Sequence, residues 1–235
     1  MFGRKKKTEI KKPADRPGLV VVDNPTSAMA EQFRTIRTNI QFSMLDKELK
    51  TFNITSPGPS SGKSFLAANI AAAFASDDKR ALLLDADMRK PTVHKTFGVP
   101  NDRGLTNLLT DNRLEIHQVI KKSYVPNLFY LTCGAIPPNP SELLASKRMQ
   151  GLMEQLRNVF DIIVLDCPPV LAATDAQVVS ARVDGTVVVV PYGQCTKDEV
   201  KESQALLDKV NTNVLGVIMN RTERTEDYYY YYEEE

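Results

Sequence analysis

Residues 55–64 read TSPGPSSGKS, a loop of small residues that ends in Gly62, Lys63 and Ser64. It lies between an apolar run that predicts a strand and an Ala-rich run that predicts a helix, the context that a phosphate-binding P-loop needs. In such a loop, backbone N–H groups and the helix N-terminus point at phosphate oxygens. Lys63 is expected to reach the β- and γ-phosphates, and the Ser64 hydroxyl to bind Mg²⁺. The residues expected to contact the nucleotide are Ser60, Ser61, Gly62, Lys63, Ser64 and Phe65.

The loop departs from the usual pattern at its start, because Pro57 takes the place of the first glycine. A bare Gly-Lys-Ser occurs often by chance, so the prediction depends on the flanking strand and helix and on two acidic motifs further along the chain. Asn220 follows the last predicted strand and is expected to read the adenine edge, although an ordinary polar loop explains it almost as well.

Two apolar runs end in carboxylates. Leu82 to Leu84 is followed by Asp85 and Asp87, and Ile162 to Leu165 is followed by Asp166. Of the first pair, one carboxylate could face a metal and the other an incoming nucleophile; the alternative is a turn in which aspartate only caps the backbone. A single aspartate at a strand end is the pattern of a Walker B ligand. Mg²⁺ takes few protein carboxylates and keeps several waters. We expect Ser64 and Asp166 to bind the metal, together with one carboxylate of the first pair.

The expected elements alternate between strands and helices. Several strands are continuous apolar runs, as in strands buried on both faces, so we expect a doubly wound α/β fold with a mostly parallel sheet and a ligand site at its carboxyl edge. The expected strands are 51–56, 81–85, 128–132, 162–166, 186–190 and 215–219. The expected helices are 27–45, 63–76, 141–159 and 197–210. Residues 1–25 are expected to form a flexible basic arm, 26–222 the catalytic domain, and 223–235 a disordered tyrosine-rich tail.

Charge is divided between the two ends of the chain. Residues 1–12 carry six basic side chains and one acid, and residues 225–235 carry five acids and no base. The near-neutral remainder argues against nucleic acid as a partner. The basic arm could touch anionic lipid or an acidic partner, or could simply be solvated. No apolar run is long enough to cross a bilayer and no secretory signal is evident, so a cytoplasmic location is expected. The three cysteines show neither disulfide nor zinc spacing.

The tail contains five consecutive tyrosines flanked by acids. They are Tyr228, Tyr229, Tyr230, Tyr231 and Tyr232. A packed core does not use such a run, so the tail is either a sticky disordered segment or a substrate for phosphorylation. Each phosphate would add about −1.5 to −2 charge units to an already acidic tail.

With these motifs in place, the chain from about Ser27 to its C-terminus resembles the bacterial tyrosine kinases of capsule and exopolysaccharide synthesis. The resemblance depends on the P-loop, on the motifs LDADMRKP at 84–91, GAIPPNPSEL at 134–143 and DCPP at 166–169, and on the tyrosine cluster. It is closest to the Gram-positive type, in which the membrane-spanning activator is a separate polypeptide.

The resemblance implies an ATP- and Mg²⁺-dependent tyrosine kinase of the P-loop, MinD/ParA-like branch, which autophosphorylates its tail tyrosines and regulates polysaccharide synthesis and export. Lys63 and Ser64 match Walker A, Asp85 and Asp87 match Walker A′, and Asp166 matches Walker B. These matches imply that Lys63, Asp85, Asp87 and Asp166 are catalytic and that Ser64, Asp85 and Asp166 bind the metal. They also make Asp87 the candidate for orienting or deprotonating the tyrosine hydroxyl, with the division of roles between Asp85 and Asp87 left open. It also implies a transmembrane activator that recruits the chain to the inner face of the membrane, a cognate tyrosine phosphatase, and protein substrates of polysaccharide synthesis.

Glu31, Arg34 and Arg37 match the Glu-x-x-Arg-x-x-Arg segment of that family, which implies a ring-shaped homo-oligomer. The alternative is a solvated helix face with an i,i+3 ion pair worth only about 0.2–0.5 kcal/mol. We expect the interface, because the motif matches in register.

Two rival functions are weighed against the kinase. A MinD/ParA-type switch ATPase carries an extra lysine early in the P-loop, where this chain has Gly58. A non-catalytic scaffold that only binds nucleotide is disfavoured by the complete set of Lys63, Ser64 and the three aspartates.

Overall fold

The computed structural model describes residues 18–44 and 48–222. The strands are β1 (Thr51–Thr55), β2 (Ala81–Asp85), β3 (Lys121–Lys122), β4 (Leu128–Leu131), β5 (Ile162–Asp166), β6 (Gly185–Pro191) and β7 (Val214–Asn220). The helices are α1 (Val20–Asp23), α2 (Ala28–Phe42), α3 (Lys63–Ala75), α4 (Val93–Phe97), α5 (Leu105–Thr110), α6 (Ile116–Val119), α7 (Pro140–Ala145), α8 (Lys147–Arg157), α9 (Asp175–Ser180) and α10 (Lys197–Asp208).

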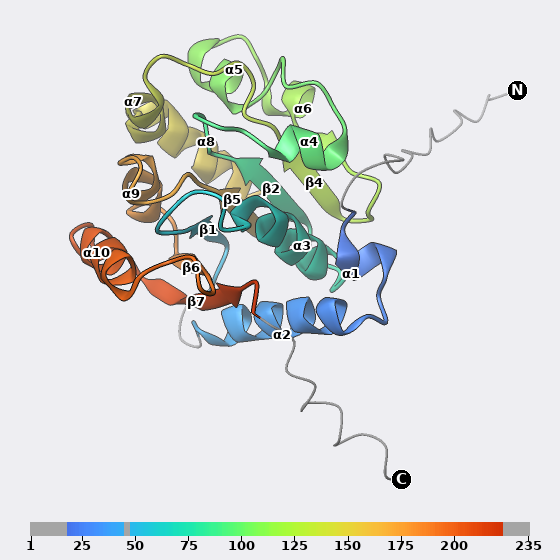
Figure 1. Cartoon of the computed structure of the whole chain (residues 1–235). Coiled ribbons are helices and arrows are strands. Elements are labelled where there is room, and N and C mark those ends of the chain that lie inside the picture. Colours follow the sequence, from blue (N-terminus) through green and yellow to red (C-terminus); the bar gives the residue numbers. More distant parts are fainter. Residues whose placement is uncertain (1–17, 45–47, 223–235) are drawn as a thin grey trace, which may run out of the picture.

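The seven strands form one sheet in the order β3-β4-β2-β5-β1-β6-β7. All the pairings are parallel except that of the short strand β3 with β4. Helices cover both faces of the sheet, with α1, α2 and α3 on one face and α7, α8 and α9 on the other (Figure 1). The predicted doubly wound fold is therefore confirmed.

Two apolar cores lie on the two faces of the sheet, and successive strand residues alternate between them. Leu83 of β2 belongs to the core beneath α3, whereas its neighbours Leu82 and Leu84 belong to the core beneath α8. Helix α3 is buried almost all round, which explains its run of alanines, because small side chains allow a helix to pack closely between sheet and neighbouring helices. This packing fixes the N-terminus of α3 at the carboxyl edge of the sheet.

Two of our expectations about the elements are wrong. The single helix expected over 141–159 is interrupted at Ser146, whose backbone is extended (φ −67°, ψ 154°) and whose hydroxyl accepts a hydrogen bond from the Met149 N–H to begin α8. The flexible arm expected over 1–25 is wrong for its C-terminal end, because Val20–Asp23 form α1 and Leu19 and Val21 are buried in the core. The rest of the arm, residues 1–17, lies outside the described residues.

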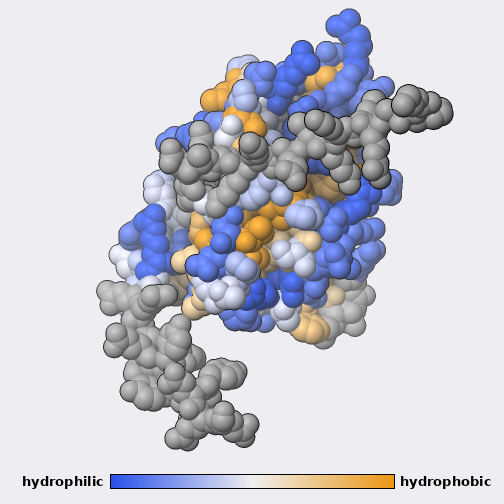
Figure 2. All heavy atoms as spheres, turned by 90° about the vertical axis from the view of Figure 1, so that its right-hand side faces the viewer, coloured by the Kyte–Doolittle hydropathy of each residue, from blue (hydrophilic) through white to orange (hydrophobic). Residues whose placement is uncertain are grey.

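The side of the molecule that carries α1 has a mostly hydrophilic surface around a central apolar area (Figure 2). Within residues 18–44 and 48–222 we find no helix with the length and apolar content needed to cross a bilayer.

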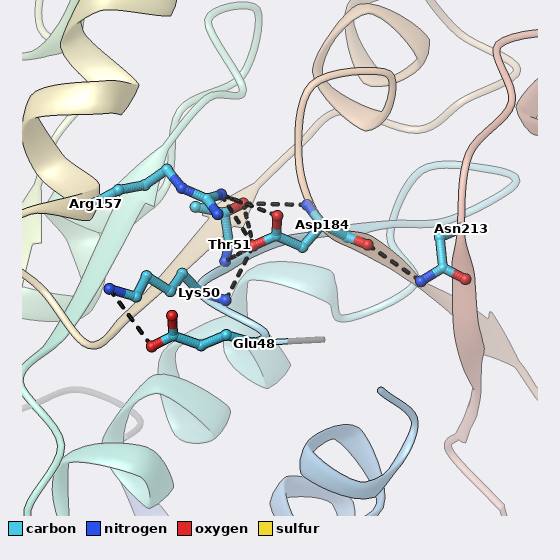
Figure 3. A network of polar contacts seen from close by, with 6 residues as sticks. All are labelled: Glu48, Lys50, Thr51, Arg157, Asp184 and Asn213. Carbon is cyan, nitrogen blue, oxygen red and sulfur yellow. Dashed lines mark hydrogen bonds and ion pairs between the residues drawn. The ribbon is translucent and has the colours of Figure 1, made fainter. Parts of the chain in front are cut away.

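The amino edge of the sheet is closed by a polar network around Asp184 (Figure 3). Its Oδ2 accepts hydrogen bonds from the backbone N–H of Lys50 at 3.0 Å and of Thr51 at 2.8 Å. Arg157 Nη1 lies 3.0 Å from both carboxylate oxygens and also donates to the Thr51 hydroxyl. This network ties the starts of β1 and β6 to the end of α8.

Candidate active site

The P-loop connects β1 to α3 through Gly62, which has a left-handed backbone with φ of +84°. A Cβ at this position would lie 2.3 Å from the Asn220 side-chain nitrogen, so glycine is needed both for its conformation and for space. The hydroxyls of Ser56 and Ser61 both donate to the Gly58 carbonyl, at 2.7 and 2.8 Å. These bonds give the loop its shape before any ligand arrives.

Lys63 and Ser64 are the first two residues of α3, where backbone N–H groups have no partner within the helix. The Lys63 side chain is only 8% exposed. Its charge and a hydrogen bond from Ser64 both act on the Asp166 carboxyl group. The structure therefore brings the predicted Walker A residues together with the predicted Walker B aspartate.

Asp85 and Asp166 end the adjacent strands β2 and β5 and lie opposite each other in the pairing register. Both are completely buried. Asp85 Oδ2 accepts hydrogen bonds from the N–H groups of Thr92 and Val93, each at 3.0 Å. The other oxygen of each carboxylate, Asp85 Oδ1 and Asp166 Oδ1, is buried without a hydrogen-bond partner in the described part of the chain.

This arrangement raises the pKa of both carboxyl groups. Burial is the main cause for Asp85, followed by the charge of Asp166, and these outweigh the hydrogen bond from Val93. Burial also raises the pKa of Asp166 to about 6, although the Ser64 hydrogen bond and the Lys63 charge act in the opposite direction. Two buried carboxyl groups whose oxygens lack partners among the described residues are unfavourable unless a cation binds between them. Oxygen ligands suit a hard divalent ion.

No group of three or more His, Cys, Asp or Glu side chains within 18–44 and 48–222 is arranged to hold a metal. A magnesium ion bound with a nucleotide does not need one, because phosphate oxygens and waters supply most of its ligands. A hydroxyl and two carboxylates, as predicted from Ser64, Asp85 and Asp166, fit such a shared ion.

Asp87 lies in the loop after β2 and is 7% exposed. Its Oδ1 accepts hydrogen bonds from the N–H groups of Arg89 at 3.2 Å and Lys90 at 2.9 Å, which closes a tight turn. The two aspartates of the motif therefore differ: Asp85 is sealed in the core beside Asp166, and Asp87 lies nearer the surface. The alternative that these aspartates only cap backbone is incomplete, because it leaves the unpartnered Asp85 oxygen unexplained.

Arg89 and Asp175 form an ion pair that the sequence did not single out. Arg89 Nε and Nη2 donate to the two Asp175 oxygens at 2.9 and 3.0 Å. The sequence signal for this pair is limited to the arginine in LDADMRKP, because the aspartate lies 86 residues further on in a loop-and-helix segment with no recognisable pattern.

Asn220 ends β7 beside the P-loop, and its Nδ2 donates to the Ser61 carbonyl at 2.9 Å. It therefore buttresses the phosphate loop; its expected contact with adenine stays a prediction. Phe65 is placed differently from the other expected nucleotide contacts. Its ring packs edge-on against Phe33 of α2 with 6.0 Å between centroids, so only its backbone remains near the helix N-terminus.

Glu31, Arg34 and Arg37 lie on α2, and all three have partners within the chain. Arg34 Nε pairs with Glu31 Oε2 at 2.8 Å, the i,i+3 contact expected of an ordinary helix face. Arg37 is largely buried; it donates to the Ala73 carbonyl and pairs with Asp77 at the end of α3. The ring interface expected from this motif stays a prediction.

The expected autophosphorylation sites lie outside the described residues, which end at residue 222. These sites are Tyr228, Tyr229, Tyr230, Tyr231 and Tyr232. Their role as phosphate acceptors, like the disorder expected of the tail, therefore stays a prediction.

Comparison with known proteins agrees with this geometry. The ParA family, described as NUBPL iron-transfer P-loop NTPase, matches residues 50–227. CapB of Staphylococcus aureus, which carries the name of a putative tyrosine-protein kinase, is 43% identical over 93% of this chain and 96% of its own length. The tyrosine-protein kinase YwqD of Bacillus subtilis is 42% identical over 86% of this chain and 85% of its own.

The chain belongs to the bacterial tyrosine kinases. Among solved structures, the chimerical protein CapA2B2 superposes with a TM-score of 0.84 at 40% identity, covering 88% of this chain and 90% of that one. The predicted family, P-loop fold and enzyme class are confirmed, and nucleotide binding with a divalent metal follows from the fold.

Proposed function

We propose that this kinase transfers the γ-phosphoryl group of Mg-ATP to tyrosine, acting on its own tail and on proteins of capsule or exopolysaccharide synthesis. The observation that supports this function best is the pair of buried aspartates, Asp85 and Asp166. One oxygen of each has no hydrogen-bond partner among the described residues, and the Lys63 charge acts on Asp166. Two buried carboxylates side by side destabilise the protein when no cation is bound, and a cation bound between them would offset this unfavourable free energy.

The roles of the residues follow from their positions. The N–H groups of residues 60–65, together with Lys63, hold the β- and γ-phosphates, while Asn220 keeps the loop in shape. Ser64, Asp85 and Asp166 would hold Mg²⁺, which when bound neutralises charge developing on the phosphates.

Asp87 is the residue we assign to the acceptor side. It is less buried than Asp85, and its Oδ1 is engaged with the backbone, which orients the carboxylate. In the transfer, the tyrosine oxygen forms a bond to the γ-phosphorus as the bond to the β,γ-bridging oxygen breaks. ADP leaves with that electron pair, and the phenol proton passes to Asp87. A phenol of pKa about 10 needs such a base at neutral pH.

The acceptors we propose belong to the tail of a neighbouring copy. The tyrosines of the described part of the chain are poorer candidates. Tyr130 is buried, with its pKa raised by burial, and stacks on Phe97 at 4.2 Å; Tyr124 is half-buried. Tyr192 is 56% exposed at the carboxyl edge, so it is the acceptor most able to compete with the tail. The proposed acceptors are Tyr228, Tyr229, Tyr230, Tyr231 and Tyr232.

Phosphorylation in trans requires copies of the chain to associate, and we propose the ring implied by Glu31, Arg34 and Arg37. The intrachain contacts of Arg37 suggest that it shapes α2 against α3, leaving the more exposed Glu31 and Arg34 to face a neighbour. A transmembrane activator would bring the kinase to the inner face of the membrane, and a tyrosine phosphatase would reset the tail. Added phosphate charge would then loosen docked tails and release the ring.

The test is to incubate the full chain with Mg-ATP and the cytoplasmic segment of a transmembrane activator of this family, and to map phosphotyrosine by mass spectrometry. We expect label on the five tail tyrosines, and its loss when all five are replaced by phenylalanine. The matched control is Tyr192→Phe, which should label normally. Absence of phosphotyrosine would refute the proposed function, and label retained on Tyr192 after tail replacement would refute the tail assignment.

A further inference from the structure

The ion pair between Arg89 and Asp175 joins the loop after β2 to the start of α9. It is bidentate, with both nitrogen–oxygen distances at or below 3.0 Å. The Asp175 side chain is completely buried, whereas that of Arg89 is 46% exposed. A buried carboxylate is unfavourable for stability alone, since well-packed apolar residues often replace such pairs without loss. Stability alone therefore does not explain why this ion pair lies beside the active site.

Asp175 is itself held in place. The Ser141 hydroxyl donates to its Oδ1, which links it to α7, and α9 packs on α7 and β1. The carboxylate is thus part of the rigid frame beneath the site. Because both of its oxygens are engaged by Arg89, the guanidinium plane is fixed in direction as well as in distance.

Arg89 in turn closes the turn that carries Asp87. Its backbone N–H donates to Asp87 Oδ1, so the residue that is tethered through its side chain also holds the catalytic carboxylate through its main chain. Asp85 holds the other end of the loop through the N–H groups of Thr92 and Val93. The loop is therefore held at two places: Asp175 binds its Arg89 side chain, and Asp85 binds the backbone of Thr92 and Val93.

We propose that Asp175 is a positioning residue for phosphoryl transfer to tyrosine, acting through Arg89 to aim Asp87 at the acceptor hydroxyl. This inference rests on the role proposed above for Asp87. Its physical basis is that a general base works only within hydrogen-bond reach of the proton it removes, and a misplacement of about 1 Å can cost about 10²-fold in rate. ATP binding, which depends on the P-loop, should be independent of this pair.

Two substitutions test the pair. Asp175→Asn keeps the shape and the contact with Ser141 but removes the charge and one acceptor for Arg89. Arg89→Lys keeps the charge but cannot make a bidentate contact. Asp184→Asn is the matched control, because it removes a carboxylate from a similar arginine pair at the other edge of the sheet. The acceptors are two peptides with the sequence of residues 226–235, carrying either tyrosine or difluorotyrosine, whose phenol is more acidic.

We expect kcat with the tyrosine peptide to fall about 10- to 100-fold in both variants, while KM for ATP stays within about twofold. The difluorotyrosine peptide should recover most of the loss, because an acceptor that ionises readily needs the misplaced base less. Wild type and Asp184→Asn should treat the two peptides almost alike. The double variant should be no slower than the slower single one, since both substitutions break one pathway.

Several outcomes would overturn the inference. One is a fall in kcat that both peptides share equally, which indicates a structural defect; another is a raised KM for ATP or an unchanged kcat. If Asp175→Asn does not fold, the inference is tested with Arg89→Lys alone, which alters a partly exposed side chain. The same quantities, kcat with each peptide and KM for ATP, are measured. A wild-type enzyme that phosphorylates neither peptide would instead refute the proposed function of the tail tyrosines as acceptors.

Discussion

The carboxylates at the two edges of the same sheet have opposite environments. At the amino edge, Asp184 accepts hydrogen bonds from two backbone N–H groups and from Arg157 (Figure 3). At the carboxyl edge, Asp85 and Asp166 lie opposite each other, and one oxygen of each has no hydrogen-bond partner within residues 18–44 and 48–222. Burial raises the pKa of Asp184, but these hydrogen bonds and the Arg157 charge together outweigh it, so that the pKa is lowered. The pKa values of Asp85 and Asp166 are raised.

We infer from this difference that Asp184 stabilises the fold, whereas Asp85 and Asp166 are suited to bind a ligand. The first edge is complete within the chain and ties elements together. We expect the second to stay electrostatically incomplete until a cation and phosphates bind, so that only this binding offsets the cost of burying its carboxylates. A substitution at the carboxyl edge should therefore lower activity without lowering stability, whereas a substitution at the amino edge should lower stability without lowering activity.

The largest effect on activity is expected from Lys63→Met. The substitution keeps a long apolar side chain at a mostly buried position but removes the charge that we expect to face the phosphates. Tyrosine phosphorylation should fall by about 10²–10³-fold. Circular dichroism and a thermal melt should show an intact fold, and label that persists at the wild-type rate would exclude this P-loop as the site.

Asp85→Asn should lower phosphorylation by about 10²-fold while making the ligand-free protein more stable, by about 1 kcal/mol. The amide oxygen can still accept the Thr92 and Val93 N–H groups, and the repulsion with Asp166 disappears. Denaturant unfolding without nucleotide measures this gain. A loss of stability would mean that Asp85 is structural and would contradict the distinction between the two edges.

Asp184→Asn should do the reverse. Removing the carboxylate that binds Lys50, Thr51 and Arg157 should lower the free energy of unfolding by about 1–3 kcal/mol at neutral pH. The kcat and KM for ATP should stay at wild-type values when measured well below the melting temperature. Reduced kcat in the folded variant would show that the amino edge reaches the chemistry.

The smallest effect concerns pH. Because the folded-state pKa of Asp184 lies below the unfolded value of about 3.9, its contribution is fully present above that value and is lost as the pH falls through the folded-state pKa. The stability difference between wild type and Asp184→Asn should therefore be constant near neutrality and shrink below pH ~4. If the stability difference stays constant down to pH ~2, it arises from packing and not from the Asp184 charge.

The P-loop fold and the meeting of Lys63, Asp85 and Asp166 at one edge of the sheet could be predicted from the sequence because their signals are local. Continuous apolar runs such as 162–165 indicate strands buried on both faces, and each predicted metal ligand among the aspartates directly follows one of them. The break at Ser146 was missed because capping by a serine hydroxyl competes with helix continuation only when the next helix packs separately. Helix α1 was missed because its burial depends on distant core residues, with four residues too few for a pattern.

Long-range polar pairing was also beyond the sequence. Arg89 and Asp175, and Asn220 with Ser61, lie far apart along the chain and meet only once the sheet is assembled. Arg37 shows a related limit: its motif spacing predicts an interface residue, but it does not indicate the partners that its charge has inside the chain. A single sequence gives side-chain type and spacing, whereas these contacts depend on how the elements pack.

The central claim, that the incomplete carboxyl edge is a site for a nucleotide with a divalent metal, is tested most directly by calorimetric melting with Mg-ATP. At about 100 times the dissociation constant, wild type and Asp184→Asn should each gain about 2.7 kcal/mol of stability. Asp85→Asn, and wild type with ATP and EDTA, should gain much less. Equal stabilisation of Asp85→Asn and wild type by Mg-ATP would contradict the account.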